Sequence, residues 1–373
     1  MAQQGLGRQL ADPVAASSKN EFDALFALAL AGFEALREER GVVEHHYAIG
    51  RDQLKLCFAG DALQPLITPA LEHLAVAPVD QPELTIMAWD LKSLTSRPMV
   101  ALEGLMRTFS WHWYYYLNSR GELKGLLEDD FMAAFHPGPN IFSLLDVKNR
   151  RAIYWANDAA EVPWHETGSP MRSILSWWTA SQGYQFAHGG AVGVDGKSVL
   201  IVGKGGSGKS TTCLACLNAG LQYLGDDYTL IDTREEPRVF SLYNTAKLKG
   251  PADLARFPQL TPHLVNAERL DSEKAMLFLH GDFDGQIIAQ SPLKAILIPV
   301  VMDQEHTKIL PAGPAAGLAA LAPSTIFQLP GSGRQSLRNI AELVQRVPCY
   351  SLRLGRDLAG VAETIRRFIA NSS

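Results

Sequence analysis

The chain has 373 residues, 47% of them hydrophobic, so it is long enough to bury at least one large core. Its formal net charge of -5 and pI near 6.1 argue against general binding to nucleic acid or to anionic membranes. No stretch approaches the ~18 apolar residues of a membrane-spanning helix, and the N-terminus lacks the apolar segment of a secretion signal. These features predict a cytoplasmic protein with no nucleic-acid and no membrane partner.

The first 165 residues contain no nucleotide-binding motif. Residues 1–20 are small and polar and are expected to form a loose tail. Hydrophobic periodicity then predicts a helix, a hairpin, a second helix and a strand, over 21–39, 42–58, 61–74 and 84–91. We therefore expect an α+β N-terminal domain over 21–165, which would recognise a substrate or a partner.

The N-terminal domain also contains an aromatic block, Trp111-His-Trp-Tyr-Tyr-Tyr116. Aromatic rings can stack on bases or sugars, but no basic residues interleave this block, so strand packing is the favoured role. A helix that joins the two domains is predicted to begin at Ser169-Pro170, in the usual order of cap and proline, and to end at Gly183.

Two strand-like runs follow, over 186–194 and 198–202, and Asp195-Gly196 separates them. An Asp-Gly pair between such runs is the strongest short signal for a β-hairpin. When residue pairs are counted outward from this turn, His188 comes to lie opposite Gly203. Register alone therefore predicts a histidine at the mouth of the loop that begins at Gly203, although a packed strand histidine is the structural alternative.

That loop is Gly203-Lys-Gly-Gly-Ser-Gly-Lys-Ser210, which has the G-x-x-x-x-G-K-S spacing of a P-loop. Its glycines allow backbone N–H groups to turn toward a phosphate, and the start of the following helix adds partial positive charge. In such loops the lysine contacts the β- and γ-phosphates and the next hydroxyl holds Mg²⁺. The motif predicts a site for ATP and Mg²⁺, with binding residues Gly203, Lys204, Gly205, Gly206, Ser207, Gly208, Lys209, Ser210 and Thr211.

Two adjacent carboxylates, Asp226 and Asp227, follow the helix within an apolar run. Burial of carboxylates is costly unless a cation or a metal receives them. Because neighbouring residues on a strand point to opposite faces, the two are expected to have different roles. The pair predicts one carboxylate on Mg²⁺ and one base for an incoming hydroxyl. A surface turn at Gly225-Asp226 is the structural alternative.

His188, the loop 203–210 and the Asp226-Asp227 pair together resemble the catalytic domain of HPr kinase/phosphorylase. His188 lies 21 residues before Lys209, and Asp226 lies 17 residues after it, as in that family. The resemblance implies an α/β P-loop domain over 166–373, with the mixed sheet of the HPr kinase and phosphoenolpyruvate carboxykinase type. It also implies transfer of the γ-phosphate of ATP to a serine hydroxyl.

The resemblance further implies a role for each of these side chains. Lys209 would contact the transferred phosphate, and Ser210 and Asp227 would ligate Mg²⁺. Asp226 would accept the proton of the hydroxyl, with His188 close by to tune it. These three, His188, Lys209 and Asp226, are the catalytic residues that the resemblance predicts.

The chain departs from the bacterial HPr kinases after the two aspartates. Where those enzymes have a signature with a metal-binding Glu, this chain has Ser241-Leu-Tyr-Asn-Thr-Ala-Lys-Leu-Lys-Gly250, which contains no carboxylate. HPr is therefore disfavoured as the substrate, and the chain more closely resembles the diverse HPr kinase-like serine kinases, some of which phosphorylate a ribosomal peptide. Within this stretch, Lys247 is either a second phosphate contact or a solvated lysine.

The C-terminal part is predicted to contain strands at 293–301 and 349–354 and helices at 335–345 and 358–370. Before the first of these helices, the stretch 329–334 is either a mobile lid with Arg334 as a charge stabiliser or an ordinary loop. Cys213 and Cys216 have no second pair at zinc-ligand spacing, so they are expected to pack the P-loop helix on the sheet.

These observations predict a two-domain, ATP-dependent kinase that phosphorylates a hydroxyl, most simply a serine on a peptide or protein. Two alternatives stay open, because a P-loop does not define the acceptor. One is an ATPase switch or regulatory scaffold that transfers nothing, and the other is a small-molecule kinase. HPr kinases are oligomers, so a homo-oligomer is expected by resemblance.

Overall fold

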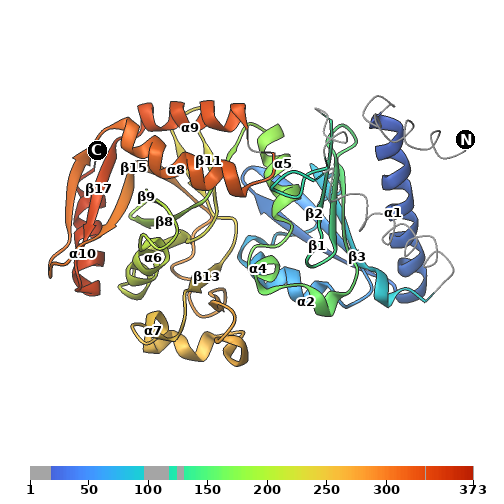
Figure 1. The fold of residues 1–373 in the computed structure, drawn as a ribbon, viewed down its shortest axis with the longest axis horizontal. Helices are drawn as coiled ribbons and strands as arrows, with labels where there is room; N and C mark the ends of the chain where they lie inside the picture. Colours follow the sequence, from blue (N-terminus) through green and yellow to red (C-terminus); the bar gives the residue numbers. More distant parts are fainter. Residues whose placement is uncertain (1–17, 96–116, 124–129, 332, 373) are drawn as a thin grey trace, which may run out of the picture. The chain divides into compact units, whose positions relative to one another are not determined.

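A computed structural model describes residues 18–95, 117–123, 130–331 and 333–372 (Figure 1). Backbone packing divides the chain into two units. The first unit comprises Met1–Glu44, Lys55–Leu63 and Leu84–Val162, and the second comprises His45–Leu54, Gln64–Glu83 and Pro163–Ser373. The aromatic block 111–116 and most of the N-terminal tail lie outside the described residues.

Two short segments that the sequence analysis placed in the N-terminal domain group instead with the second unit. Within 45–54, the Arg51 N–H donates a hydrogen bond to Tyr184 Oη at 2.8 Å. Within 64–83, the Pro69 carbonyl accepts a hydrogen bond from Asn244 Nδ2 at 2.7 Å. These long-range contacts could not be read from local patterns, because each joins residues more than a hundred positions apart.

The six-stranded sheet has the order β1-β2-β3-β6-β5-β4. Its strands are β1 Val42–Ile49, β2 Asp52–Ala59, β3 Leu84–Asp90, β4 Phe131–His136, β5 Ile141–Asp146 and β6 Arg151–Ala156. The helix α1, Ser18–Arg40, packs its apolar stripe into the core that includes Trp89 and Trp155. These two rings stack at 5.2 Å across the parallel pair β3 and β6. The expected first helix, hairpin and strand are confirmed.

The continuous helix expected over 61–74 is wrong. The chain forms α2, Gln64–Ile67, and then two single 3₁₀ turns, Thr68–Ala70 and Glu72–Leu74. Proline has no N–H for an intrahelical hydrogen bond and its ring clashes with the preceding turn. Pro69 therefore ends α2, and the apolar spacing that predicted a helix is satisfied by turns that bury Ile67, Ala70 and Leu74.

The second unit contains a nine-stranded mixed sheet with the order β10-β8-β9-β15-β12-β11-β7, to which β17 and β16 are joined through β15. Its strands are β7 Gln185–Ala187, β8 Gly189–Val194, β9 Lys197–Val202, β10 Gln222–Gly225, β11 Thr229–Asp232, β12 Arg238–Phe240, β15 Gln290–Val301, β16 Lys308–Ala312 and β17 Cys349–Leu354. The strand β15 is parallel to β9 and β17 and antiparallel to β12. The expected α/β class with a mixed sheet is therefore what the second unit shows.

Helices cover both faces of this sheet (Figure 1). The helices α6 Lys209–Asn218 and α10 Leu358–Ala370 share one core with Val199 and Ile201 of β9. The helices α8 Pro314–Gln328 and α9 Arg334–Arg346 share the other core with Leu200 and Val202. Because successive strand residues point to opposite faces, the part of a strand that is buried on both sides is expected to be apolar, as β9 is from Val199 to Val202.

Smaller elements complete the second unit. They are α4 Trp164–Thr167, α5 Arg172–Ser181, α7 Pro251–Leu254 and a two-stranded antiparallel ribbon of β13 Thr245–Leu248 and β14 Ala275–Phe278. The helix expected to begin at Ser169-Pro170 begins instead at Arg172, because Met171 takes a left-handed conformation with φ 53°. No helix within the described ranges combines the length and the apolarity that crossing a bilayer requires.

Candidate functional site

The hairpin of β8 and β9 has the expected register. Asp195 and Gly196 both have positive φ, 49° and 76°, as a tight two-residue turn of this kind requires. Val194 pairs with Lys197, and the last pair at the open end is Gly189 with Val202. His188 and Gly203 are therefore the next residues on the two arms, and the hairpin brings the histidine to the start of the glycine-rich loop.

The glycine-rich loop joins β9 to α6, in the order of elements that the motif predicts. Gly206 and Gly208 have φ values of 78° and 99°, in the left-handed region that favours glycine. Lys209 begins the helix, is only 7% exposed, and donates from Nζ to the Gly203 carbonyl at 2.7 Å. Burial lowers the pKa of Lys209, although the nearby Asp227 and Asp226 oppose this. The Lys209 ammonium group is thus bonded to the backbone of its own loop.

The two aspartates follow β10, which is antiparallel to β8 as β9 is, so the ends of β9 and β10 meet at one rim of the sheet. They face different ways, as neighbours on an extended chain should. Asp226 is 1% exposed and accepts a hydrogen bond from the Lys247 N–H at 3.0 Å. The Asp227 side chain is 27% exposed and lines the pocket in front of the loop.

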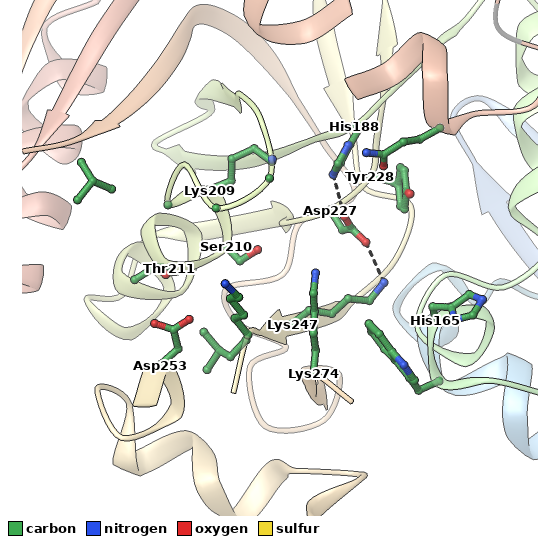
Figure 2. A pocket seen from close by; sticks show the side chains of 18 of the residues that line it. His165, His188, Lys209, Ser210, Thr211, Asp227, Tyr228, Lys247, Asp253 and Lys274 are labelled. Carbon is green, nitrogen blue, oxygen red and sulfur yellow. Dashed lines mark hydrogen bonds and ion pairs between the residues drawn. The ribbon is translucent and has the colours of Figure 1, made fainter. Parts of the chain in front are cut away.

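Asp227 is held by two nitrogen atoms from different segments, one of His188 and one of Lys247 (Figure 2). Its Oδ1 lies 3.1 Å from His188 Nε2, and its Oδ2 accepts a hydrogen bond from Lys247 Nζ at 2.8 Å. Burial would raise the pKa of Asp227, but Lys247 and His188 outweigh it and hold the pKa well below the usual range for a carboxyl. Asp227 is therefore an ionised carboxylate with a lone pair still free on each oxygen.

Asp226 is in the opposite electrostatic situation. Burial and the neighbouring Asp227 charge raise its pKa, against the opposing effects of Lys247 and the Ser210 side chain. Its Oδ1 makes no hydrogen bond with any described residue. A buried carboxylate with a free oxygen beside the Ser210 hydroxyl is an arrangement that a cation would complete.

Lys247 is a candidate site residue that the sequence indicated only weakly. It is 6% exposed rather than solvated, and its Nζ donates to Ser169 Oγ as well as to Asp227, both at 2.8 Å. Gly168 makes room for it, because a Cβ at that position would lie 2.9 Å from Lys247 Cε. The stretch 241–250, which contains no carboxylate, therefore supplies a cation to Asp227.

A pocket of about 720 Å³ lies in front of the loop, within the second unit. His188, Asp227 and Lys247 line it together with Gly205, Gly206, Gly208, Lys209, Ser210 and Thr211 of the loop (Figure 2). Sequence reasoning missed its other polar lining residues, which are Trp164, His165, Arg172, Tyr228, Lys249, Asp253, Arg256, Lys274 and Gln328. They come from separate segments, and no local motif marks them.

Several predicted or discussed residues do not line this pocket, namely Gly203, Lys204, Ser207, Asp226, Arg334, Cys213 and Cys216. Asp226 lies behind the lining, as described above. Arg334 does not line it and belongs to the first turn of α9, so it is a helix residue here. The preceding stretch is packed, since Leu329 is buried and the Pro330 carbonyl accepts a hydrogen bond from Ser176 Oγ at 2.7 Å. Cys213 and Cys216 are buried, free thiols in the core under α6, as expected.

Comparison with known proteins gives a limited result. No protein-family model matches the chain, and no curated protein matches its sequence. Among solved structures, the chain is similar to the HPr(Ser) kinase/phosphatase from Coxiella burnetii, with 13% identity and a TM-score of 0.28. The match covers 49% of this chain and 95% of that one. At this degree of similarity no family membership is shown, and the chemistry must come from the residues themselves.

Proposed function

We propose that this protein is an ATP- and Mg²⁺-dependent kinase of the HPr kinase-like type, which phosphorylates a serine hydroxyl on a peptide or protein. The observation that carries the proposal is the position of Asp227, held by His188 and Lys247 at the pocket that the glycine-rich loop lines. A phosphate-binding loop facing a positioned base is the arrangement that phosphoryl transfer to a hydroxyl requires.

The residues present fit a nucleotide and a magnesium ion. No cluster of three or more His, Cys, Asp or Glu side chains suited to a metal occurs in the part of the chain that the structure describes. Mg²⁺ does not need one, because it is typically held by one or two protein oxygens together with substrate phosphates. The Ser210 hydroxyl and the free Oδ1 of Asp226 would supply these oxygens. When bound, Mg·ATP would provide the phosphoryl group and neutralise part of the charge that develops on it.

The geometry favours the reverse of the roles that the resemblance gave to the two aspartates. Asp227 reaches the pocket and can accept the proton of an entering hydroxyl on a free lone pair, whereas Asp226 is buried behind it. His188 fixes Asp227 Oδ1. Lys247 can turn from Asp227 Oδ2 toward a phosphate, which would raise the basicity of the carboxylate as the reaction proceeds. Lys209 would leave the Gly203 carbonyl to contact the same phosphates.

The proposal is tested by measuring where the phosphate of ATP goes. The purified protein is incubated with [γ-³²P]ATP and Mg²⁺, alone and with lysate of the source cells, next to an Asp227→Asn control. We expect slow hydrolysis alone and label on a serine of one acceptor in the lysate, dependent on Asp227. Fast hydrolysis without acceptor and without labelled product would favour the ATPase switch, and label on a low-mass product would favour a small-molecule kinase.

A further inference from the structure

The pocket carries more positive charge than a nucleotide site needs. Its described lining includes six cationic side chains, Arg172, Lys209, Lys247, Lys249, Arg256 and Lys274, against two carboxylates, Asp227 and Asp253. In a P-loop site, backbone N–H groups, one lysine and Mg²⁺ already receive the triphosphate. Since Mg²⁺ neutralises part of the triphosphate charge, the surplus of lysine and arginine points to a second anionic group in the pocket.

Four of these six cations already have partners. Lys209 is bonded to the loop carbonyls and Lys247 to Asp227. Arg172 donates to Tyr228 Oη at 3.0 Å and pairs with Glu166, and Arg256 lies 4.0 Å from Asp253. Lys249 and Lys274 are exposed, and their side-chain ammonium groups make no hydrogen bond or ion pair with any described residue. They are therefore the two cations available to a ligand.

The ribbon of β13 and β14 places these two lysines against each other. Lys247 pairs with Met276 and Leu248 with Ala275, so one further step in this register sets Lys249 opposite Lys274. Like charges directly opposite on paired strands are destabilising. Lys274 also acts on the loop, since its charge helps to lower the pKa of Lys209. An anion between the ribbon and the loop would relieve both repulsions.

The position of this lysine pair suits an acceptor better than a nucleotide. In phosphoryl transfer the entering and leaving oxygens are roughly in line, so the acceptor comes from the side opposite the donor. With the donor on the loop, the entering hydroxyl must pass Asp227 and Lys247. Lys249 follows the end of β13 and lies two residues beyond Lys247, which is about 7 Å along an extended chain. That distance equals two residues of an extended peptide.

Building on the proposed function, we propose that Lys249 and Lys274 bind carboxylates of an acidic peptide segment, about two residues from the acceptor serine. A peptide is favoured over a small anion because both lysines are exposed at the pocket's edge, where a chain can continue outward. The substrate class is then a serine peptide or protein loop with Asp or Glu next to the phosphorylated position.

The test uses two fluorescein-labelled synthetic peptides, Gly-Gly-Ser-Gly-Glu-Glu-Gly and its counterpart with Gln in place of both Glu. Fluorescence anisotropy measures their binding to the full chain saturated with Mg·AMPPNP. We expect the Glu peptide to bind roughly 3- to 30-fold more tightly, the size expected for two partly exposed ion pairs. The preference should shrink at 1 M salt, where exposed charges are screened within about 3 Å.

Variants of the two lysines make the test specific. In the double variant K249Q/K274Q the preference should disappear while the affinity for Mg·AMPPNP stays unchanged, and K249E/K274E should prefer a peptide with Lys in place of both Glu. Lys308→Gln, an exposed lysine on β16 away from the pocket lining, is the matched control and should behave as wild type.

The outcomes separate this inference from the function on which it rests. Equal binding of the two peptides, or no detectable binding of either, would overturn the acidic-peptide inference while leaving a nucleotide site intact. Loss of Mg·AMPPNP affinity in K249Q/K274Q would overturn it as well, because the lysines would then belong to the nucleotide. Failure of the wild type to bind Mg·AMPPNP would contradict the proposed function itself.

Discussion

The glycine-rich loop and the β13–β14 ribbon line the same pocket but present different chemical groups to it. The loop is contiguous in sequence, offers mainly backbone N–H groups, and satisfies its only pocket lysine internally, through Lys209 and the Gly203 carbonyl. The ribbon offers side chains, with Lys247 in β13, Lys249 just after it and Lys274 just before β14, and α7 and two 3₁₀ segments separate the two strands. Backbone chemistry can recognise any phosphate, whereas the arrangement of side chains can be specific to this chain. The comparison suggests that the loop binds what many proteins bind, and that the ribbon selects the substrate.

The largest expected effect is on the rate of phosphoryl transfer and comes from substituting Asp227, which lies between the loop and the ribbon. Asp227→Asn should lower phosphoryl transfer by about 10²–10⁴, the usual effect of removing a general base, while Mg·AMPPNP binding is retained. Asp226→Asn should instead raise the Mg²⁺ concentration needed for half-maximal activity. Single-turnover rates measured across a Mg²⁺ titration distinguish the two. If Asp226→Asn shows the loss of transfer and Asp227→Asn the metal defect, the roles are those that the family resemblance gave.

The next largest effect distinguishes the role of the loop from that of the ribbon, through substitutions of Lys209 and Lys247. Lys209→Met should weaken Mg·AMPPNP binding by about 10- to 100-fold, because a charge-assisted hydrogen bond contributes about 1.5–3 kcal/mol. Titration calorimetry measures this, with Lys308→Gln as a control. Lys247→Met should leave most of the ground-state binding and reduce turnover, since Lys247 is bonded to Asp227 and would turn toward the phosphate only as the reaction proceeds. Equal losses of nucleotide affinity in both variants would show that loop and ribbon bind the same group.

The support beneath the loop is tested by Gly190→Ala. A Cβ on Gly190 would lie 2.4 Å from Cys213 Sγ and 2.9 Å from Asp226 Cα, so α6 and the aspartate segment would have to shift. We expect a loss of about 1–3 kcal/mol in the free energy of unfolding, measured by urea denaturation. Gly205→Ala is the matched control, because nothing lies within 4 Å of its Cβ position. Partial recovery in the double variant with Cys213→Ala would identify the sulfur as the source of the clash.

The smallest expected effect is a pH dependence that the two aspartates give in opposite directions. Because the pKa of Asp226 is raised by folding, its contribution to stability is lost as pH rises above the unfolded value of about 3.9. The depressed pKa of Asp227 gives a contribution that is present above about 3.9 and is lost as pH falls below it. Relative to wild type, Asp226→Asn should therefore be more stable at pH 8 than at pH 5. Urea unfolding at the two pH values measures this, and no change in the difference would contradict the assignment of a buried, destabilised carboxylate.

The parts of the site that could be predicted from sequence are those fixed by local chain geometry. The Asp195-Gly196 turn sets the hairpin register, and the register brings His188 to Gly203. The loop could be read for the same reason, because its glycines and Lys209 are neighbours in sequence. The opposed directions of Asp226 and Asp227 followed from the alternation of an extended chain.

The remainder depends on contacts that no local pattern contains. Lys247 reaches Asp227 across 20 positions, and the sequence around it says only that a lysine lies between apolar residues. Ser169 looked like a helix cap but accepts a hydrogen bond from Lys247, and the helix begins three residues later at Arg172. The choice between the two aspartates likewise required the tertiary structure, because only packing decides which carboxylate faces the pocket.

The three-way pairing of β15 has a consequence for how the protein is made. The strand that leads into the glycine-rich loop, β9, has β15 as its neighbour on one side, and β12 and β17 reach the sheet through the same strand. During synthesis the loop emerges from the ribosome long before Gln290–Val301 does, and pairing between distant segments is intrinsically slow. A nascent chain that ends before β15 would expose the unpaired edge of β9 with the loop attached. The proposed nucleotide site can therefore be completed only late in translation, after its glycine-rich loop has already been synthesised.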